Sequence, residues 1–74
     1  MRIAVLGAGS WGTTLANMLA KKGEEVRLWA YEAEVVEAVN RDHMNPVFLP
    51  NSRLEPALKA FNDPLEALHN VEAI

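Results

Sequence analysis

Residues 3–12 have the sequence Ile-Ala-Val-Leu-Gly-Ala-Gly-Ser-Trp-Gly, and this stretch decides the fold that we expect. Residues 3–6 are continuously apolar, which is typical of a strand that is covered on both faces. Glycines then follow at Gly7, Gly9 and Gly12, in the spacing Gly-x-Gly-x-x-Gly. Because this spacing is common by chance, its meaning depends on the elements around it.

Those elements give the motif a specific context. After the glycines, apolar residues recur at helical spacing and a basic last turn precedes Gly23, so we expect a helix over residues 10–22. Residues 26–31 are rich in strand-favouring side chains and predict a second parallel strand. The acidic residue Glu32 follows about twenty residues after the third glycine. This order of elements is typical of the Rossmann dinucleotide-binding turn.

Each glycine of the motif has its own expected role. Gly7 permits a tight turn out of the strand, Gly9 lacks the Cβ that would keep a pyrophosphate away from the backbone, and Gly12 lets helix and strand pack closely. The helix N-terminus then offers the phosphates the amides of Ser10 and Trp11 and the positive end of its dipole. The alternative is that the glycines only make a tight connection between strand and helix.

Three side chains near the turn each have a binding and a structural interpretation. Trp11 either touches the ligand or packs against neighbouring side chains. Tyr31 either forms a wall against the adenine ring at the carboxyl end of the second strand or is a core aromatic. Glu32 either accepts hydrogen bonds from the adenine ribose hydroxyls, which favours NAD over NADP, or is the solvated first residue of a second helix.

The rest of the chain predicts shorter elements. Residues 32–40 place their valines on one helical face, which predicts a second, shorter helix. Residues 58–61 fit a short strand. Between them, Pro46 and Pro50 break the pattern into a loop. Asp63 is expected to cap a further helix, with Pro64 and Glu66 in its first turn and with Leu65 and Leu68 facing inward. Residues 71–74 are expected to begin a strand. The fold class is α/β, a Rossmann-type three-layer fold with a parallel sheet that is incomplete in this chain.

The composition excludes several classes of function. The net charge is −3 and no basic run is longer than Lys21-Lys22, so we expect no nucleic-acid partner. The absence of cysteine excludes disulfides, thiolate metal sites and a cysteine nucleophile. His43 and His69 are too far apart to form a local metal motif. The first apolar run is too short for a signal peptide or a membrane span, and we expect a cytoplasmic protein.

Two separated motifs make the chain resemble a known family. The first is Gly-Ala-Gly-Ser-Trp-Gly-Thr-Thr-Leu-Ala over residues 7–16, and the second is Asn-Arg-Asp-His-Met-Asn-Pro-Val-Phe-Leu-Pro over residues 40–50. In order and spacing they resemble the N-terminal region of NAD(P)-dependent sn-glycerol-3-phosphate dehydrogenases, over essentially the whole chain. The first motif is shared in looser form with dehydrogenases of hydroxy acids and sugar acids, and the second narrows the resemblance.

The resemblance implies an oxidoreductase that interconverts dihydroxyacetone phosphate and sn-glycerol 3-phosphate, with NAD or NADP as its cofactor, and so supplies the glycerol backbone of phospholipids. It implies cofactor contacts at these positions: Gly7, Gly9, Ser10, Trp11, Gly12 and Tyr31. Bacterial members of the family often carry histidine or arginine where this chain has Tyr31 and Glu32, which leaves the choice of cofactor open.

The resemblance also implies how the protein is divided. Residues 1–74 would be the N-terminal part of a dinucleotide-binding domain, and the rest of that domain and a helical substrate domain, with the catalytic lysines, would follow. We therefore expect no catalytic residue and no metal site here, a structural role for His43, an inactive isolated segment and a homodimeric whole enzyme. Two alternatives are the corresponding segment of a related hydroxy-acid or sugar-acid dehydrogenase, and a nucleotide-binding module without catalysis.

Overall fold

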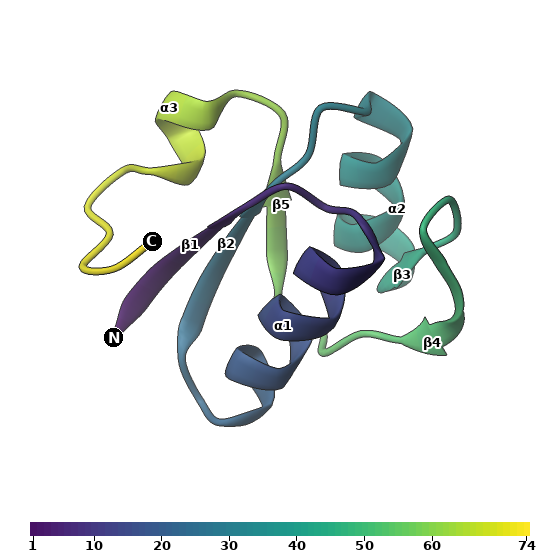
Figure 1. Cartoon of the computed structure of the whole chain (residues 1–74), viewed down its shortest axis with the longest axis horizontal. Coiled ribbons are helices and arrows are strands. Elements are labelled where there is room, and N and C mark those ends of the chain that lie inside the picture. Colours follow the sequence, from purple (N-terminus) through teal and green to yellow (C-terminus); the bar gives the residue numbers. More distant parts are fainter.

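Three parallel strands form the centre of the chain, whose computed structural model describes every residue from Met1 to Ile74 (Figure 1). The strands are β1 (Arg2–Leu6), β2 (Glu25–Trp29) and β5 (Lys59–Phe61), and they are arranged in the order β1-β2-β5. The register of β1 and β2 runs from Arg2 opposite Glu25 to Leu6 opposite Trp29. Because all three strands point the same way, their carboxyl ends lie at one edge of the sheet.

Helices cover both faces of this sheet, as a three-layer fold requires. The helices are α1 (Ser10–Lys21), α2 (Ala33–Asp42) and α3 (Pro64–Ala67). Alternate residues of β2 show the two faces. Val26 and Leu28 are buried in the apolar core with residues of α1 and α2, whereas Arg27 donates hydrogen bonds to carbonyl oxygens of α3. The predicted α/β fold with a parallel sheet is therefore confirmed.

The last residues of the chain extend the sheet on the other side of β1. Ala73 forms a parallel bridge with Ile3, and the amide of Ala4 donates to the carbonyl of Ala73 at 2.9 Å. The predicted strand start is thus confirmed as a single bridge. Since the chain first adds β2 and β5 on one side of β1 and then returns to the other, the strand order reverses at β1. In open α/β sheets, ligands bind at the carboxyl ends of the strands where this reversal occurs.

The loop that we predicted around the two prolines is wrong, because the segment forms an antiparallel hairpin. Its strands are β3 (Met44–Asn45) and β4 (Leu49–Arg53), which pair through Met44 with Arg53 and Asn45 with Leu49. Pro46 lies in the turn between the strands, and Pro50 lies within β4 with an exposed side chain. A proline is tolerated there because an edge strand does not need every amide for its ladder.

Three smaller expectations also need correction. β2 ends at Trp29, so Ala30 and Tyr31 belong to the loop that follows it. The carboxyl end of β1 is not covered on both faces, because its last residue, Leu6, is 48% exposed. Leu65 does not face inward but is 77% exposed, because α3 is a single turn that buries only Ala67.

Candidate functional site

The glycine motif forms the turn between β1 and α1, at the edge where the strand order reverses. Gly7 has a φ of 114°, a conformation that side chains other than glycine's rarely adopt, and its amide donates to the carbonyl of Trp29 at 3.0 Å. A Cβ on Gly12 would overlap the carbonyl oxygen of Gly7, so the helix can approach the turn this closely only with a glycine there. The turn is therefore pinned beside the end of β2.

The outer side of the turn is open. Gly9 precedes α1 with extended backbone angles, and a Cβ there would meet no atom of the chain within 4 Å. The first helical hydrogen bond runs from the amide of Thr13 to the carbonyl of Gly9, so the amides of Ser10 and Trp11 have no acceptor within the chain. Free amides at the positive end of a helix dipole make a site suited to an anion.

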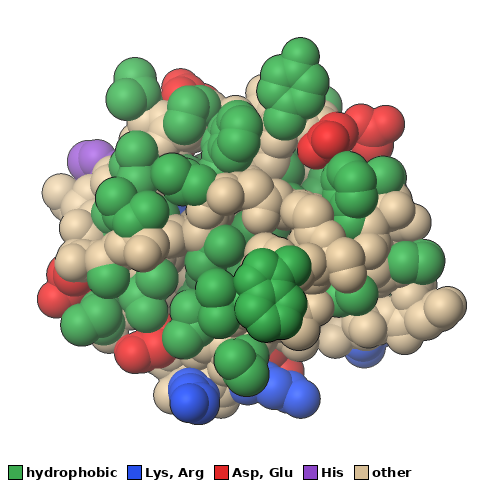
Figure 2. All heavy atoms as spheres, in the orientation of Figure 1, with side chains coloured by type: hydrophobic (Ala, Val, Ile, Leu, Met, Phe, Trp, Pro, Cys, Tyr) green, Lys and Arg blue, Asp and Glu red, His purple; other side chains and the backbone are tan.

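Side chains around this edge are apolar or acidic rather than basic. Figure 2 shows the prominent Lys and Arg side chains of this face at its lower edge, whereas the parallel strands point upward in the same view of Figure 1. Trp11 is 80% exposed and Tyr31 is 79% exposed, so neither packs in the core. The contact of these two aromatics with a ligand stays a prediction.

Glu32 is the N-cap residue of α2, in the loop that follows β2. Its carboxylate makes no capping hydrogen bond and no ion pair, so it is free to meet a ligand. The nearest basic residue along the chain, Arg27, lies on the other face of the sheet. Its guanidinium stacks over the Phe61 ring at 4.1 Å and donates to the carbonyl oxygens of Glu66 and Ala67. It is therefore unable to reach an anion beside Glu32.

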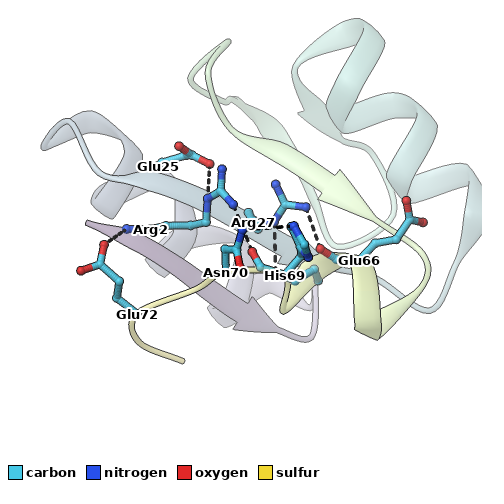
Figure 3. A network of polar contacts seen from close by, with 8 residues as sticks. Arg2, Glu25, Arg27, Glu66, His69, Asn70 and Glu72 are labelled. Atoms are coloured by element: carbon cyan, nitrogen blue, oxygen red, sulfur yellow. Dashed lines mark hydrogen bonds and ion pairs between the residues drawn. The ribbon is translucent and has the colours of Figure 1, made fainter.

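The face covered by α3 holds the network of polar contacts in Figure 3. Arg2 pairs with Glu25 at 2.5 Å and donates to the carbonyl of His69 at 3.1 Å. A cavity of about 300 Å³ lies here, lined by Arg27, Leu65, Glu66 and His69. Both arginines of the network are already engaged by carboxylate or carbonyl oxygens, so this cavity offers no free cation and is separate from the glycine turn.

Two asparagines hold the candidate site in place, and sequence reasoning missed both. The Asn45 side chain is fully buried and donates to the carbonyl of Ala8, inside the glycine turn, at 2.8 Å. The Asn62 side chain donates to the carbonyls of Ala30 and Tyr31 at 3.1 and 2.7 Å, which ties down the loop before α2. Asn45 belongs to the second sequence motif, which was the only signal that could have indicated it.

Residues 41–43 of the second motif, Arg41, Asp42 and His43, make local contacts at the end of α2. His43 ends α2 in a left-handed conformation with φ 57°, and its carbonyl accepts a hydrogen bond from the amide of Leu54. Arg41 donates hydrogen bonds to Asp42, and this pairing lowers the pKa of Asp42 below its ordinary value. No group of three or more metal-ligating side chains occurs in the structure. None of the helices combines the length and apolarity that a membrane crossing demands.

The fold and the turn together define a Rossmann-type nucleotide-binding segment, and comparison with known proteins defines the family. The family model described as "NAD-dependent glycerol-3-phosphate dehydrogenase N-terminus" matches residues 2–74. This chain belongs to that family.

Individual relatives agree with this assignment. A glycerol-3-phosphate dehydrogenase [NAD(P)+] of Nitratidesulfovibrio vulgaris is 55% identical over 74 residues, which are 100% of this chain and 22% of the relative. One of Geobacter sulfurreducens is 59% identical over 66 residues, 89% of this chain and 20% of the relative. The crystal structure of the enzyme from Coxiella burnetii superposes with a TM-score of 0.85 at 47% identity, over 95% of this chain and 22% of that chain. The chain thus spans about a fifth of the length of these relatives.

Proposed function

We propose that this segment binds the adenine half and the pyrophosphate of a nicotinamide dinucleotide at the carboxyl edge of its sheet. The single observation that carries the proposal is the open outer side of the turn at Gly9, beside amides without acceptors and at the point where strand order reverses. The residues that we assign to the cofactor are Gly7, Gly9, Ser10, Trp11, Gly12, Tyr31 and Glu32.

Each of these residues would contact a different part of the cofactor. The amides of Ser10 and Trp11 would bind the pyrophosphate, while the exposed ring of Tyr31 would lie against the adenine. The carboxylate of Glu32 would accept hydrogen bonds from the ribose hydroxyls. We propose a preference for NAD(H) over NADP(H), because Glu32 would repel a ribose phosphate and Arg27 is engaged elsewhere.

For the whole protein we propose the interconversion of dihydroxyacetone phosphate and sn-glycerol 3-phosphate, which the names of the relatives and the family resemblance support. The bound nicotinamide would exchange a hydride with C2 of this three-carbon phosphate ester. Residues 1–74 would supply cofactor binding and orientation only, and the catalytic groups would lie in the rest of the nucleotide domain and in a helical substrate domain. We also propose that the whole protein is a homodimer, which sedimentation analysis would test, and that it is cytoplasmic, as its composition and short first apolar run indicate.

The decisive experiment measures NADH binding and turnover of the full-length protein, in wild type and in Gly9→Val. A valine at Gly9 meets open space in the protein but would occupy the place of the pyrophosphate, so we expect NADH affinity to fall on the order of a hundred-fold with little change in melting temperature. Equal affinity in both proteins would show that the turn is not the binding site.

Substrate assays separate the alternatives. NADH oxidation that depends on dihydroxyacetone phosphate supports the proposed reaction. Oxidation that depends instead on a keto acid or a sugar-acid substrate would favour a related dehydrogenase, and NADH binding without turnover of any of these substrates would favour a non-catalytic module.

A further inference from the structure

A buried polar cluster joins the glycine turn to the hairpin formed by β3 and β4, which lies beside the first turn of α1 (Figure 1). Thr13 and Asn45 are both fully buried, and they come from segments 32 residues apart in the sequence. Asn45 Nδ2 donates to Thr13 Oγ1 at 2.8 Å and to the carbonyl of Ala8 at 2.8 Å. Thr13 Oγ1 donates to the same carbonyl at 3.1 Å.

The carbonyl of Ala8 therefore has two donors on the inner side of the turn. A peptide unit is planar and trans, so its C=O and N–H groups point in opposite directions. Fixing the carbonyl of Ala8 toward the buried cluster therefore directs the amide of Gly9 outward. The amide of Gly9 has no acceptor within the chain, and Gly9 itself is exposed.

We infer that Asn45 and Thr13 are positioning residues that hold the Ala8–Gly9 peptide with its N–H toward the pyrophosphate. This inference rests on the proposed function, and it adds a donor to the amides of Ser10 and Trp11. Gly7, which here has a φ of 114°, can adopt many other backbone angles because it is a glycine. The turn could therefore take several conformations. The buried cluster removes that choice before the ligand arrives, so that binding does not have to order the turn.

The chain offers variants and controls that isolate this role. Thr13→Val keeps the shape and removes the hydroxyl, Thr13→Ser keeps the hydroxyl, and Asn45→Leu removes both of the donations made by the amide. Thr14→Val is the control for Thr13→Val, because Thr14 Oγ1 donates only to the carbonyl of Ser10, at 2.8 Å. Asn40→Leu is the control for Asn45→Leu.

The Asn40 control is matched in its hydrogen bonding to backbone, although Asn40 is exposed and Asn45 is fully buried. Asn40 donates to the carbonyl of Ala60 at 2.9 Å and accepts from the amide of Ala60 at 2.8 Å. Asn45 likewise donates to the carbonyl of Ala8 and accepts from the amide of Phe48, at 3.2 Å. Ala60 lies in β5, which is separated by β2 from the strand at which the strand order reverses, β1. A variant that merely loosens the fold would therefore behave like Asn40→Leu.

The experiment titrates the full-length variants with NADH, with ADP-ribose and with adenosine, and records their melting temperatures. We expect Thr13→Val and Asn45→Leu to bind the two pyrophosphate-containing ligands about ten-fold more weakly, which corresponds to about 1.4 kcal/mol. Adenosine affinity should not change. Thr13→Ser and both controls should bind all three ligands within about two-fold of wild type, a difference of less than half a kcal/mol.

Unchanged affinity for NADH and ADP-ribose in a folded Thr13→Val protein would overturn the inference, and this variant decides the question even where Asn45→Leu does not fold. Equal weakening of adenosine, or equal weakening in Asn40→Leu, would also overturn it, since either result means a general loosening. A wild-type protein that binds neither NADH nor ADP-ribose would overturn the proposed function and the inference together.

Discussion

The loops at the carboxyl ends of β1 and β2 lie side by side, yet they are built in opposite ways. The first loop offers a ligand its backbone: glycines bring the helix close, and the amides at the start of α1 are free. The second loop offers side chains, since Tyr31 is exposed and the carboxylate of Glu32 is unpaired. Amides can bind any pyrophosphate, whereas a carboxylate distinguishes between riboses. If the proposed function holds, the first loop would supply affinity and the second loop would supply selectivity.

The largest effect should come from Gly12, where the first loop is tightest. In Gly12→Ala, the new Cβ would overlap the carbonyl oxygen of Gly7 and lie 3.2 Å from its carbonyl carbon, so backbone must move. We expect the free energy of unfolding of the full-length protein to fall by about 3 kcal/mol, at the upper end of overpacking effects. Urea denaturation followed by circular dichroism measures this.

Gly9→Ala is the matched control for that substitution. Gly9 has φ −67° and open space around its Cβ position, so alanine fits without strain. Its stability should stay the same or rise by up to about 1 kcal/mol, because alanine restricts the unfolded chain. If both variants lost equal stability, the close approach at Gly12 would not be what fixes the first loop.

The second loop should control cofactor choice. In Glu32→Arg, a cation replaces the carboxylate beside the ribose, so the ratio of kcat/KM for NADH to that for NADPH should fall tens-fold, which corresponds to about 2 kcal/mol. The control is Glu34→Arg, which makes the same charge change in the first turn of α2 at an exposed site. A wild-type preference for NADPH, or an equal shift in both variants, would mean that Glu32 does not recognise the ribose.

The sequence predicts the structure of the first loop better than that of the hairpin formed by β3 and β4, for a physical reason. The roles of Gly7 and Gly12 follow from local backbone geometry, which a glycine spacing between a strand and a helix encodes. The hairpin was missed because Pro46 and Pro50 indicate a break in any regular element, and only pairing across the hairpin shows that a strand continues past one of them. Short elements have too few residues for a periodicity, which is why Leu65 was placed inward incorrectly.

The contacts made by the two supporting asparagines could not be predicted from the sequence, although Asn45 lies in the second motif. Asn45 contacts Ala8 across 37 residues of sequence, and Asn62 contacts Tyr31 across 31. An asparagine between helices and strands is ordinarily assigned to a turn, since its side chain often bonds to nearby backbone. Spacing along the chain carries no information about partners that the fold brings together. The residues that we propose to contact a ligand were therefore easier to find than the residues that hold them.

The smallest effect should come from Asn62, which supports the second loop as the buried cluster supports the first. In Asn62→Ala, the carbonyls of Ala30 and Tyr31 lose their donor, but Tyr31 is exposed and water can replace part of the loss. We expect stability to fall by about 1 kcal/mol and the preference for NADH over NADPH to weaken about three-fold, because the carboxylate of Glu32 is held less firmly.

Asp63→Ala is the control for Asn62→Ala. It removes the cap of α3, in which Asp63 accepts from the amide of Leu65 at 2.9 Å, also at a cost of about 1 kcal/mol. The same fall in selectivity in Asp63→Ala would show that the second loop depends on overall stability rather than on Asn62. A fall confined to Asn62→Ala would show that each loop has its own supporting side chain, with affinity and selectivity adjustable independently.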